Sequence, residues 1–346
     1  MNKKVLVAIS GGVDSAVAAY LLKRDGYDVT GIMLRLYDKP ESTDAQDAKT
    51  LCEKLGIEFV YPDYRAEFKA QVIDRFAASY LRGEIPNPCV DCNHYVKIPF
   101  VFDYALKEGF DNIATGHYAR VSYSESQKRY LLLKGKDTAK DQSYVLCNLP
   151  QNILSKLLLP IGDLSKNQVR EIASEQKFVN ADKKDSQDIC FINGNYYDYL
   201  KDNCGVVLKE GDFVDMQGKV LGKHKGAVCY TRGQRKGLGL ALPRPMYVLS
   251  KDMEKNTVLL GYNEDLYTDC AVAEDVNFIS CESIDGEIPV CARVRYNQKE
   301  QPGIAFVTDD NKLCVRFENP QRAVTPGQFL VLYQGDSVVA GGKIIK

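Results

Sequence analysis

Short apolar runs alternate with helical patterns at the start of the chain. The strand-like runs are Lys4 to Ile9, Tyr27 to Leu36 and Glu58 to Tyr61, and the helical patterns between them are Ser15 to Asp25 and Thr43 to Leu55. Buried strands separated by amphipathic helices predict an α/β fold with a doubly wound parallel sheet. The ligand of such a sheet lies beyond the carboxyl ends of its strands.

Further helices and strands extend this pattern, and we assign residues 1–202 to one α/β domain. Apolar residues at helical spacing predict a long helix from Arg65 to Arg82. The other expected elements are a helix near Val96 to Glu108, a strand at Asn112 to Thr115, helices around Asp141 to Cys147 and Lys166 to Gln176, and a polar loop running into a strand at Asp185 to Phe191.

The pattern changes twice in the second half of the chain. From about Asn203 the runs are short and glycine-rich, which predicts a small mixed domain over residues 203–269. From about Cys270, alternating apolar and polar positions predict antiparallel strands, and their number and turn spacing are typical of a small β-barrel over residues 270–346. The clearest of these strands are Val290 to Tyr296, Gly303 to Val307, Leu313 to Phe317 and Phe329 to Tyr333.

Composition limits the class of protein. A chain of 346 residues with 45% hydrophobic and 26% charged residues is typical of a globular protein of two or three domains. The sequence has no apolar run of about 18 residues and no signal-peptide pattern, so we expect a cytoplasmic protein without a membrane span. The 11 cysteines are spread along the chain in an odd number, and most are expected to be reduced.

Charge is distributed unevenly although the net charge is only −1. From Met216 to Lys251 there is no acidic residue, while acidic residues return between Asp252 and Glu287. A basic patch on a nearly neutral protein suits a large polyanion that is held at one face. The basic residues of this segment are Lys219, Lys223, Lys225, Arg232, Arg235, Lys236, Arg244 and Lys251.

A glycine loop, Ile9-Ser10-Gly11-Gly12-Val13-Asp14-Ser15, follows the first apolar run and precedes a helical pattern. Its glycines allow a sharp turn close to a ligand, and the helix after it directs unpaired N–H groups and its positive dipole end at the loop. Such a loop is typical of a site that binds a phosphate group. It matches neither the Walker A nor the dinucleotide fingerprint. It resembles the loop of the PP-loop ATP pyrophosphatase superfamily, with an adenine nucleotide alpha hydrolase-like fold, whose members cleave ATP between its α and β phosphates.

A second segment, Pro86 to Asn93, contains two prolines and Cys89-x-x-Cys92. The prolines predict an exposed, extended loop, and a cysteine between this loop and the next helix is expected to have a stabilised thiolate. Half of a zinc site is another interpretation, but only His94 and His117 lie near in the sequence as further ligands. A redox pair is a third, although the surrounding pattern is not the strand-to-helix unit typical of such pairs.

Six sequence blocks resemble those of the bacterial and mitochondrial tRNA-specific 2-thiouridylases of the PP-loop superfamily. The first is Asn87-Pro88 with Cys92-Asn93 and Lys97. Cys89 departs from the family, many of whose members have Asp at that position, so an acid or base role for it is in question. The other blocks are Thr115-Gly116-His117-Tyr118-Ala119-Arg120, Lys140-Asp141-Gln142-Ser143-Tyr144, Asp185-Ser186-Gln187-Asp188-Ile189-Cys190-Phe191, Gly233-Gln234-Arg235-Lys236-Gly237-Leu238-Gly239 and Pro326-Gly327-Gln328.

The resemblance implies roles for individual residues. It implies Cys92 as the catalytic nucleophile and Cys190 as the carrier of a persulfide, the two ending as a disulfide. It implies contact with the target base for Asn87, Pro88 and Cys89. The ATP-binding residues are expected to be Ala8, Ile9, Ser10, Gly11, Gly12, Val13, Asp14, Ser15, Leu34 and Gly116, with Mg²⁺ bound alongside ATP and Asp14 as its candidate protein ligand. The tRNA contacts are expected to be His117, Lys140, Asp141, Gln142, Arg295, Tyr296 and Gln328.

The resemblance therefore implies an ATP-dependent sulfurtransferase that converts the wobble uridine of tRNA into 2-thiouridine. Adenylation of the C2 oxygen makes it a leaving group, and sulfur arrives from a cysteine persulfide charged by a cysteine desulfurase relay. A monomer is expected. Two alternatives stay open: an AMP-forming ligase or amidotransferase acting on a small metabolite, and a non-catalytic module that binds tRNA or holds a metal. The ligase needs neither two isolated cysteines nor a basic segment, and the module would tolerate loss of both cysteines.

Overall fold

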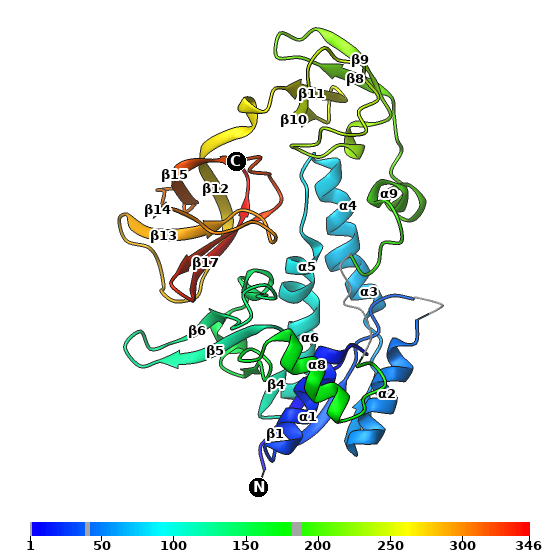
Figure 1. The fold of residues 1–346 in the computed structure, drawn as a ribbon, viewed down its shortest axis with the longest axis vertical. Helices are drawn as coiled ribbons and strands as arrows, with labels where there is room; N and C mark the ends of the chain where they lie inside the picture. Colours follow the sequence, from blue (N-terminus) through cyan, green and yellow to red (C-terminus); the bar gives the residue numbers. More distant parts are fainter. Residues whose placement is uncertain (1, 39–41, 182–188) are drawn as a thin grey trace.

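A parallel sheet forms the amino-terminal part of the computed structural model, which describes residues 2–38, 42–181 and 189–346 (Figure 1). Its strand order is β3-β2-β1-β4-β7, with every pairing parallel. The chain runs outward from β1 to one side and then to the other, so the sheet is doubly wound, as predicted. Its strands are β1 Lys4–Ala8, β2 Asp28–Ile32, β3 Glu58–Val60, β4 Asn112–Ala114 and β7 Leu157–Leu158.

Helices cover both faces of this sheet because β1 is apolar on both sides. Val5 and Val7 pack with helices α1 (Val13–Arg24), α2 (Asp44–Leu55) and α8 (Lys166–Glu175). Leu6 points to the opposite face and packs with α6 (Ile98–Lys107). Successive side chains of a strand face opposite sides, so a fully buried strand reads as a continuous apolar run.

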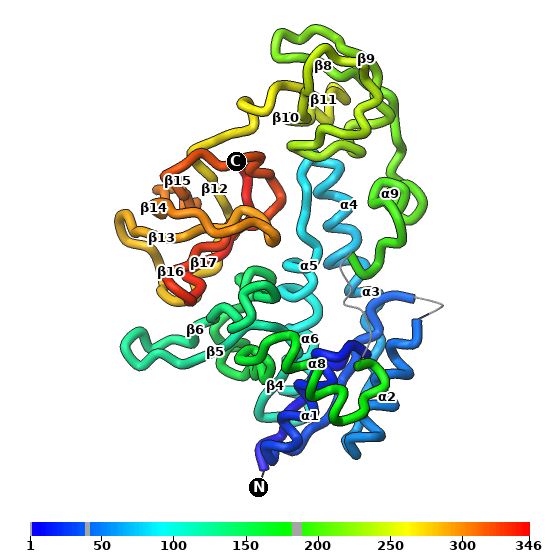
Figure 2. The backbone as a smooth tube through the Cα atoms, in the orientation of Figure 1, coloured from blue at the N-terminus to red at the C-terminus, as the bar shows by residue number. Residues whose placement is uncertain are grey.

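Two long helical stretches extend from the sheet toward the rest of the molecule (Figures 1 and 2). The first consists of α3 (Arg65–Phe68), a π-helical turn η1 (Lys69–Ile73) and α4 (Asp74–Leu81), which confirms the helix predicted from Arg65. The second consists of α5 (Pro88–Asp91), a π-helical turn η2 (Cys92–Lys97) and α6. Helix therefore begins at Pro88, and the prediction of an extended loop up to Asn93 is wrong there. A proline fits the first position of a helix, where its missing N–H has no intrahelical partner.

The remaining elements of this part are short. The helix expected near Asp141 is a single 3-10 turn, η3 (Ser143–Leu146), followed by α7 (Gln151–Leu154). A hairpin of β5 (Ala119–Ser124) and β6 (Arg129–Lys134) was not predicted. Asp185 to Asp188 lie outside the described residues, and Cys190 and Phe191 form a turn instead of the expected strand. Phe191 nevertheless packs between Phe68 and Phe76 in the core, which fixes the residue next to Cys190.

The central part is a small mixed sheet, as predicted, with the order β10-β11-β8-β9. Its strands are β8 Gly211–Val214, β9 Val220–His224, β10 Tyr247–Asp252 and β11 Thr257–Gly261, and only β11 and β8 run parallel. Helix α9 (Tyr196–Cys204) precedes this sheet, and the 3-10 turns η4 (Ala227–Cys229) and η5 (Glu264–Leu266) flank its later strands. The apolar side of the sheet packs with α4.

The carboxyl-terminal part is a closed antiparallel β-barrel, which confirms the predicted architecture. The ring runs β12-β15-β14-β13-β16-β17 and returns to β12. One end of β17 also pairs with β6 through Ser337 and Leu133, so the hairpin joins the barrel to the amino-terminal part. No helix within the described ranges is long and apolar enough to span a bilayer. The strands are β12 Tyr267–Phe278, β13 Ile288–Arg293, β14 Gln301–Val307, β15 Leu313–Arg322, β16 Phe329–Gln334 and β17 Ser337–Ile344.

Candidate functional site

The glycine loop lies between β1 and α1, at the point where the sheet changes direction. Gly11 has φ +73°, and a Cβ atom there would stand 2.6 Å from the carbonyl oxygen of Asp44. Only glycine fits both constraints. Gly12 is the N-cap of α1, and the Ser15 hydroxyl accepts from the Ser10 N–H (3.1 Å) and donates to the Gly12 carbonyl (3.1 Å). The loop is thus held in a fixed conformation with the first turn of α1 at its end.

The Asp14 carboxylate is part of an ion pair that the sequence did not predict. The Lys166 ammonium lies 2.8 and 2.9 Å from its two oxygens, and the Tyr118 hydroxyl donates to it over 2.7 Å. The Lys166 side chain is 9% exposed, so its charge is directed into the loop region. Lys166 begins a helix 152 residues from Asp14, and no local pattern marks that contact. The Asp14 carboxylate is therefore already held by one cation and one hydroxyl.

Two further predicted nucleotide residues lie around this loop. A Cβ atom on Gly116 would stand 2.7 Å from the backbone at Asp14 and Ser15, so this glycine allows the chain after β4 to touch the first turn of α1. Leu34 is half-buried just beyond β2 and packs on the core of the sheet. Asn180, which the sequence analysis did not select, donates to the Gly11 carbonyl over 3.1 Å. The predicted residues thus gather at one edge of the sheet, where a ligand of this fold binds.

Asn87 determines how the cysteine helix begins, which is the stretch from α5 through η2 that contains Cys89 and Cys92. Its side-chain oxygen accepts from the N–H groups of Cys89 (3.2 Å) and Val90 (3.4 Å), which makes it the N-cap of α5. Pro88 is buried at the first helical position. Of the three residues expected at the target base, Cys89 alone has an exposed side chain. Cys92 is one helical turn further on and is only 8% exposed.

The structure brings Cys190 next to both cysteines of this helix. Its thiol interacts electrostatically with Cys92 and with Cys89, and these interactions contribute to the raised pKa of both. Tyr37, which follows β2 in the chain, lies close to these thiols. Burial and then the neighbouring Cys190 thiol, which is also its hydrogen-bond partner, raise the pKa of the Tyr37 hydroxyl. Cys92 contributes to the same shift. Tyr37 was not identified from the sequence, because it stands outside every motif.

Burial, and not the helix start, dominates the acidity of these thiols. Burial raises the pKa of Cys92 to about 11, although the Lys97 ammonium and the Lys97 backbone N–H both favour its thiolate. The Cys89 side chain is exposed to solvent, but the protein atoms crowded around its thiol still desolvate it and raise its pKa, with Lys97 again opposing the shift. The predicted stabilised thiolate is therefore wrong for this conformation: protein atoms crowd the site more strongly than the helix end stabilises an anion. Lys97 is thus a cation that favours the thiolate form of both cysteines.

His117 lies beside Lys97 at the same edge. Burial, with a smaller contribution from the Lys97 charge, lowers the pKa of His117 to about 3, so its ring is neutral near pH 7. Its Nδ1 is 2.8 Å from the Thr115 hydroxyl. Gln142 accepts from the Tyr118 N–H over 2.9 Å, and Lys140 is half-buried close by.

Asp141 and Gln328 make internal contacts that hold the barrel against the catalytic part. Asp141 is buried and accepts from the Arg293 guanidinium (3.0 Å) and from the Ser143 hydroxyl (3.0 Å). The Gln328 amide donates to the carbonyls of Ile85 (2.7 Å) and Pro86 (3.2 Å), directly before the cysteine helix. As placed, both side chains have structural partners.

Arg295 and Tyr296 follow β13 in the barrel. Burial lowers the pKa of Arg295, and its guanidinium donates to the Ala323 carbonyl over 3.2 Å. Burial, then the Asp141 carboxylate and then the Cys89 thiol raise the pKa of Tyr296, so this barrel residue lies in the electrostatic neighbourhood of Cys89. The barrel thus brings an aromatic side chain to the surface around Cys89.

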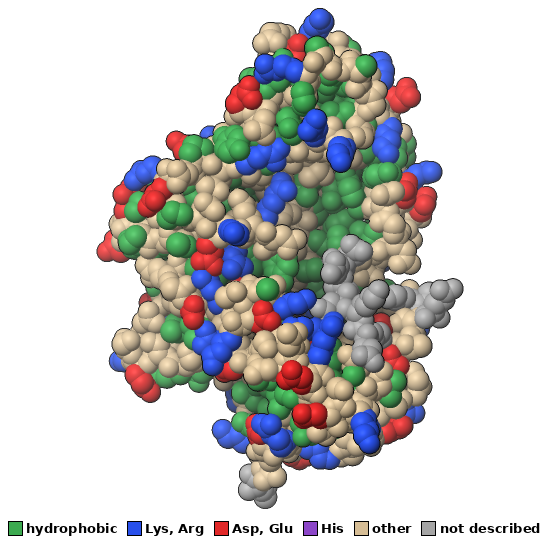
Figure 3. Space-filling view, viewed as in Figure 1, with side chains coloured by type: hydrophobic (Ala, Val, Ile, Leu, Met, Phe, Trp, Pro, Cys, Tyr) green, Lys and Arg blue, Asp and Glu red, His purple; other side chains and the backbone are tan. Residues whose placement is uncertain are grey.

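The acid-free segment exposes most of its cations. Lys219, Lys223, Lys225, Arg235, Lys236 and Arg244 are exposed, whereas Lys251 is half-buried and burial lowers the pKa of its ammonium to about 8. Figure 3 shows an apolar hollow in the middle of one face. Lys and Arg side chains lie at the edges of this hollow and over the small mixed sheet. Such a surface suits the phosphate groups of a polyanion.

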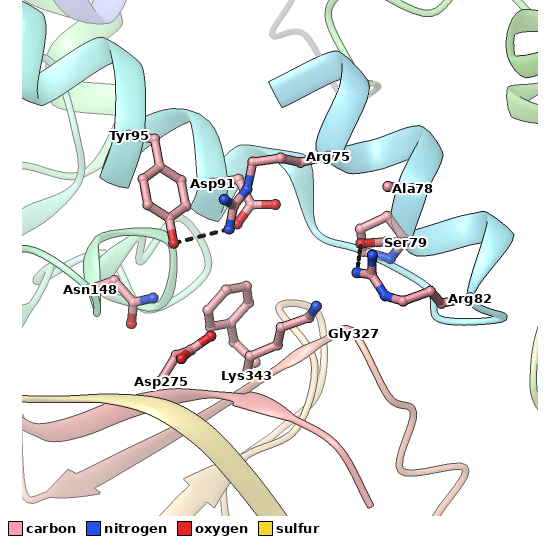
Figure 4. A pocket seen from close by; sticks show the side chains of 12 residues that line it. Arg75, Ala78, Ser79, Arg82, Asp91, Tyr95, Asn148, Asp275, Gly327 and Lys343 are labelled. Carbon is pink, nitrogen blue, oxygen red and sulfur yellow. Dashed lines mark hydrogen bonds between the residues drawn. The ribbon is translucent and has the colours of Figure 1, made fainter. Parts of the chain in front are cut away.

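A separate cavity of about 270 Å³ lies between α4, the cysteine helix and the barrel (Figure 4). Arg75 donates there to the Tyr95 hydroxyl over 3.1 Å, and burial raises the pKa of Asp91, between the two cysteines in sequence, to about 6. Cys89 and Cys92 do not line this cavity, although the Asp91 carboxylate still interacts electrostatically with the Cys89 thiol. Within the described ranges, no three His, Cys, Asp or Glu side chains form a group that could hold a metal ion, and the zinc interpretation has no support there.

Comparison with known proteins covers the whole chain. Family models match as a tRNA methyl transferase HUP domain over residues 3–194, a tRNA methyl transferase PRC-barrel domain over 197–262 and an aminomethyltransferase beta-barrel domain over 268–344. The tRNA-specific 2-thiouridylase of Clostridioides difficile is 44% identical over 100% of this chain and 99% of its own length. The chain belongs to the tRNA-specific 2-thiouridylase family. Relatives of the same name from Carboxydothermus hydrogenoformans and Acetivibrio thermocellus are also 44% identical, over 100% and 99% of this chain and 98% and 99% of their own lengths. The family predicted from the six sequence blocks is confirmed.

Proposed function

We propose that this protein is an ATP-dependent tRNA 2-thiouridylase that adenylates the C2 oxygen of a wobble uridine and replaces it with sulfur. The observation that carries this proposal is the meeting of Cys92 and Cys190, which are far apart in the sequence, at the edge of a sheet that also presents the glycine loop. Its membership of the 2-thiouridylase family agrees with the proposal. A ligase for a small metabolite would have no use for this pair of thiols.

The glycine loop suits the first step, in which the uridine C2 oxygen attacks the α-phosphorus of ATP and diphosphate leaves. Backbone N–H groups of Gly11 to Ser15 would hold the departing diphosphate at the start of α1. Lys166 places a positive charge beside this loop through Asp14, where negative charge develops. Mg²⁺ would neutralise further phosphate charge. Leu34 and Gly116 would border the adenosine.

The thiols suit the second step, in which sulfur displaces AMP. A persulfide on Cys190 supplies the sulfur, and Cys92 attacks the Cys190 sulfur of that persulfide. Hydrosulfide is then released to attack C2, or the persulfide attacks C2 first and Cys92 cleaves the resulting bridge. Either order expels AMP, places one sulfur on the base and leaves a Cys92–Cys190 disulfide, which external reductant must reduce. Lys97 would favour the Cys92 thiolate during this attack.

The exposed cations of the segment from Lys219 to Arg244 would bind tRNA phosphates without regard to sequence. The anticodon loop would then reach the surface formed by Asn87, Pro88, Cys89 and Tyr296, with the target base turned out of its stack. Lys140, Gln142, His117 and Arg295 would contact the tRNA around this surface. We further propose that the protein acts as a cytoplasmic monomer charged by a cysteine desulfurase relay, since one chain contains both the loop and the thiols.

The decisive experiment is incubation of the purified protein with ATP, Mg²⁺, a persulfide donor and unmodified tRNA, followed by mass spectrometry of the nucleosides. We expect 2-thiouridine and AMP in equal amounts, and no 2-thiouridine from Cys92→Ser or Cys190→Ser. The variant Cys281→Ser, at a half-buried barrel cysteine, is the matched control. Diphosphate release that depends on a small metabolite and ignores tRNA would instead support the ligase.

A further inference from the structure

A third thiol, Cys89, lies beside the two that the proposed function uses. Cys89 and Cys92 are one turn apart in a continuous helical stretch, and residues at this spacing lie on the same side of a helix. Their Cα atoms are therefore about 5 Å apart, within the roughly 4.4–6.8 Å that a disulfide spans. The Cβ atoms at this spacing are about 5–6 Å apart and a disulfide brings them to about 3.5–4.5 Å, so the pair can form a disulfide if the first helical turn moves by about 1 Å.

The two sulfur atoms differ in access. Cys89 is exposed, whereas Cys92 is 8% exposed. In a pair of this kind, the exposed sulfur is the one that an external dithiol can attack, while the buried sulfur is protected. A reductant can therefore attack a Cys89–Cys92 disulfide at Cys89, just as it can attack a Cys92–Cys190 disulfide at Cys190, which is also exposed.

Cys190 lies in the electrostatic neighbourhood of both helix cysteines. Phe191 packs against Phe68 and Phe76 with ring centroids 5.7 and 5.6 Å away, so the position next to Cys190 is anchored in the core. The Cys190 thiol interacts with Cys89 as well as with Cys92. Asp91, between the two helix cysteines, lines the separate cavity, and its charge acts on the Cys89 thiol less than Cys190 does.

We propose that Cys89 is the resolving thiol of the reaction cycle: it attacks the Cys92 sulfur of the Cys92–Cys190 disulfide and so releases Cys190. This inference rests on the proposed function, which supplies that disulfide. One S–S bond breaks and one forms, the proton lost by Cys89 is gained by Cys190, and no net oxidation occurs. An external dithiol of the thioredoxin or dithiothreitol class then attacks Cys89, becomes oxidised to its own disulfide and restores both helix thiols.

The exchange frees the persulfide carrier before the reductant acts. Cys190 can accept the next sulfur while the oxidised pair waits within the helix. Cys89 therefore has a use in this chain that differs from an acid or base at the same position, since a carboxylate cannot exchange disulfides.

Disulfide mapping after a single turnover tests the proposal. Trypsin cleavage after Arg82, Lys97, Lys184 and Lys201 places both helix cysteines in the peptide 83–97 and Cys190 in the peptide 185–201. Enzyme charged with persulfide is mixed with ATP, Mg²⁺ and tRNA without reductant, quenched with acid and alkylated. We expect wild-type peptide 83–97 to lack two hydrogens and the Cys190 peptide to be alkylated. In Cys89→Ser the two peptides are expected to be cross-linked.

A wild-type protein that forms 2-thiouridine yet retains the cross-link between the two peptides would overturn the inference and leave the proposed function intact. Absence of both 2-thiouridine and any disulfide would overturn the proposed function itself. The wild-type result requires no variant, so it stands even if Cys89→Ser folds poorly.

Turnover at varied dithiol concentration separates resolution from contact with the base. With little dithiol, we expect Cys89→Ser to turn over about tenfold more slowly than wild type, and the ratio to narrow as dithiol is raised. Cys281→Ser should follow the wild-type curve. A defect in Cys89→Ser that stays constant at every dithiol concentration would contradict the resolving role.

Discussion

The ammonium of Lys166 lies 2.8 Å from one carboxylate oxygen of Asp14, and this ion pair joins α8 to the first turn of α1. The Lys166 side chain is almost fully buried, and the Tyr118 hydroxyl completes the contact. The pair fixes both the charge and the orientation of the side chain at the end of the glycine loop.

Replacing Lys166 with Met should therefore impair adenylation. The change leaves Asp14 without its cation, and we expect tRNA-dependent AMP formation to fall by about tenfold or more and the free energy of unfolding by about 2 kcal/mol. Lys136→Met removes an ion pair with Asp163 whose side chains are 62% and 63% exposed, and should change both quantities little. Equal effects of the two changes would contradict a special role for Lys166.

The glycine loop offers a matched pair of glycines. Both Gly11 and Gly26 have positive φ, +73° and +86°, but only at Gly11 would a Cβ atom meet backbone, 2.6 Å from the Asp44 carbonyl. Gly26→Ala should cost only about 1 kcal/mol of conformational strain. Gly11→Ala should also displace the loop and abolish detectable ATP binding, as measured by calorimetry. Similar ATP affinities in the two variants would show that the loop geometry is not required.

The acidity of Cys92 predicts how sulfur transfer depends on pH. Because burial raises its pKa to about 11, the thiolate fraction increases by about tenfold for each pH unit below that value. Single-turnover sulfur transfer from preadenylated tRNA should therefore accelerate from pH 7 to pH 9. Lys97→Met removes a charge that lowers this pKa, so its profile should shift to higher pH. Lys107→Met, at an exposed position of α6, should leave the profile in place.

His117 predicts a stability change with pH in the acidic range. Its pKa is lowered from 6.5 to about 3 in the folded protein, so the unfolded chain binds the extra proton between these values. The stabilisation from the neutral ring is present above pH 6.5 and is lost as the pH falls toward 3. Denaturation by urea at pH 7.5 and 5 should show a smaller loss for His117→Gln than for wild type. The opposite order would contradict a buried neutral ring.

The contact between Arg293 and Asp141 gives a test of structural against tRNA-binding roles. Both side chains are largely buried, with exposed fractions of 14% and 2%. Arg293→Met leaves a buried, unpaired carboxylate and should destabilise the protein by about 3 kcal/mol. The control is Arg316→Met, whose ion pair with Glu287 is 55% exposed on both sides and should matter little. Thermal unfolding without tRNA measures both, and no difference between them would show that Asp141 is free for another partner.

The sequence predicts the sheet and the barrel well because burial determines both patterns. Apolar runs such as Val5 to Val7 appear wherever a strand is covered on two faces, and alternation appears wherever one face lines a barrel. The start of the cysteine helix was predicted wrongly because proline was taken as a helix breaker. Asn87 caps the first turn and Pro88 occupies its first position, where proline is favoured.

The sequence motifs identified the main candidate residues of the site, but not the residues that hold them in place. Gly11, Cys92 and Cys190 belong to local sequence patterns, so they could be selected before the fold was known. Lys166 and Tyr37 act through contacts that form only when the sheet brings distant segments together, and neither has a local signal. The sign of the Cys92 pKa shift also depends on how much protein surrounds the thiol, which no sequence motif reports.

The Gln328 amide donates hydrogen bonds to the carbonyls of Ile85 and Pro86, immediately before the helix that contains Cys89 and Cys92. The barrel is therefore more than a separate RNA-binding domain. It supports the segment that leads into the reactive helix, so the position of the thiols depends on the integrity of the neighbouring barrel.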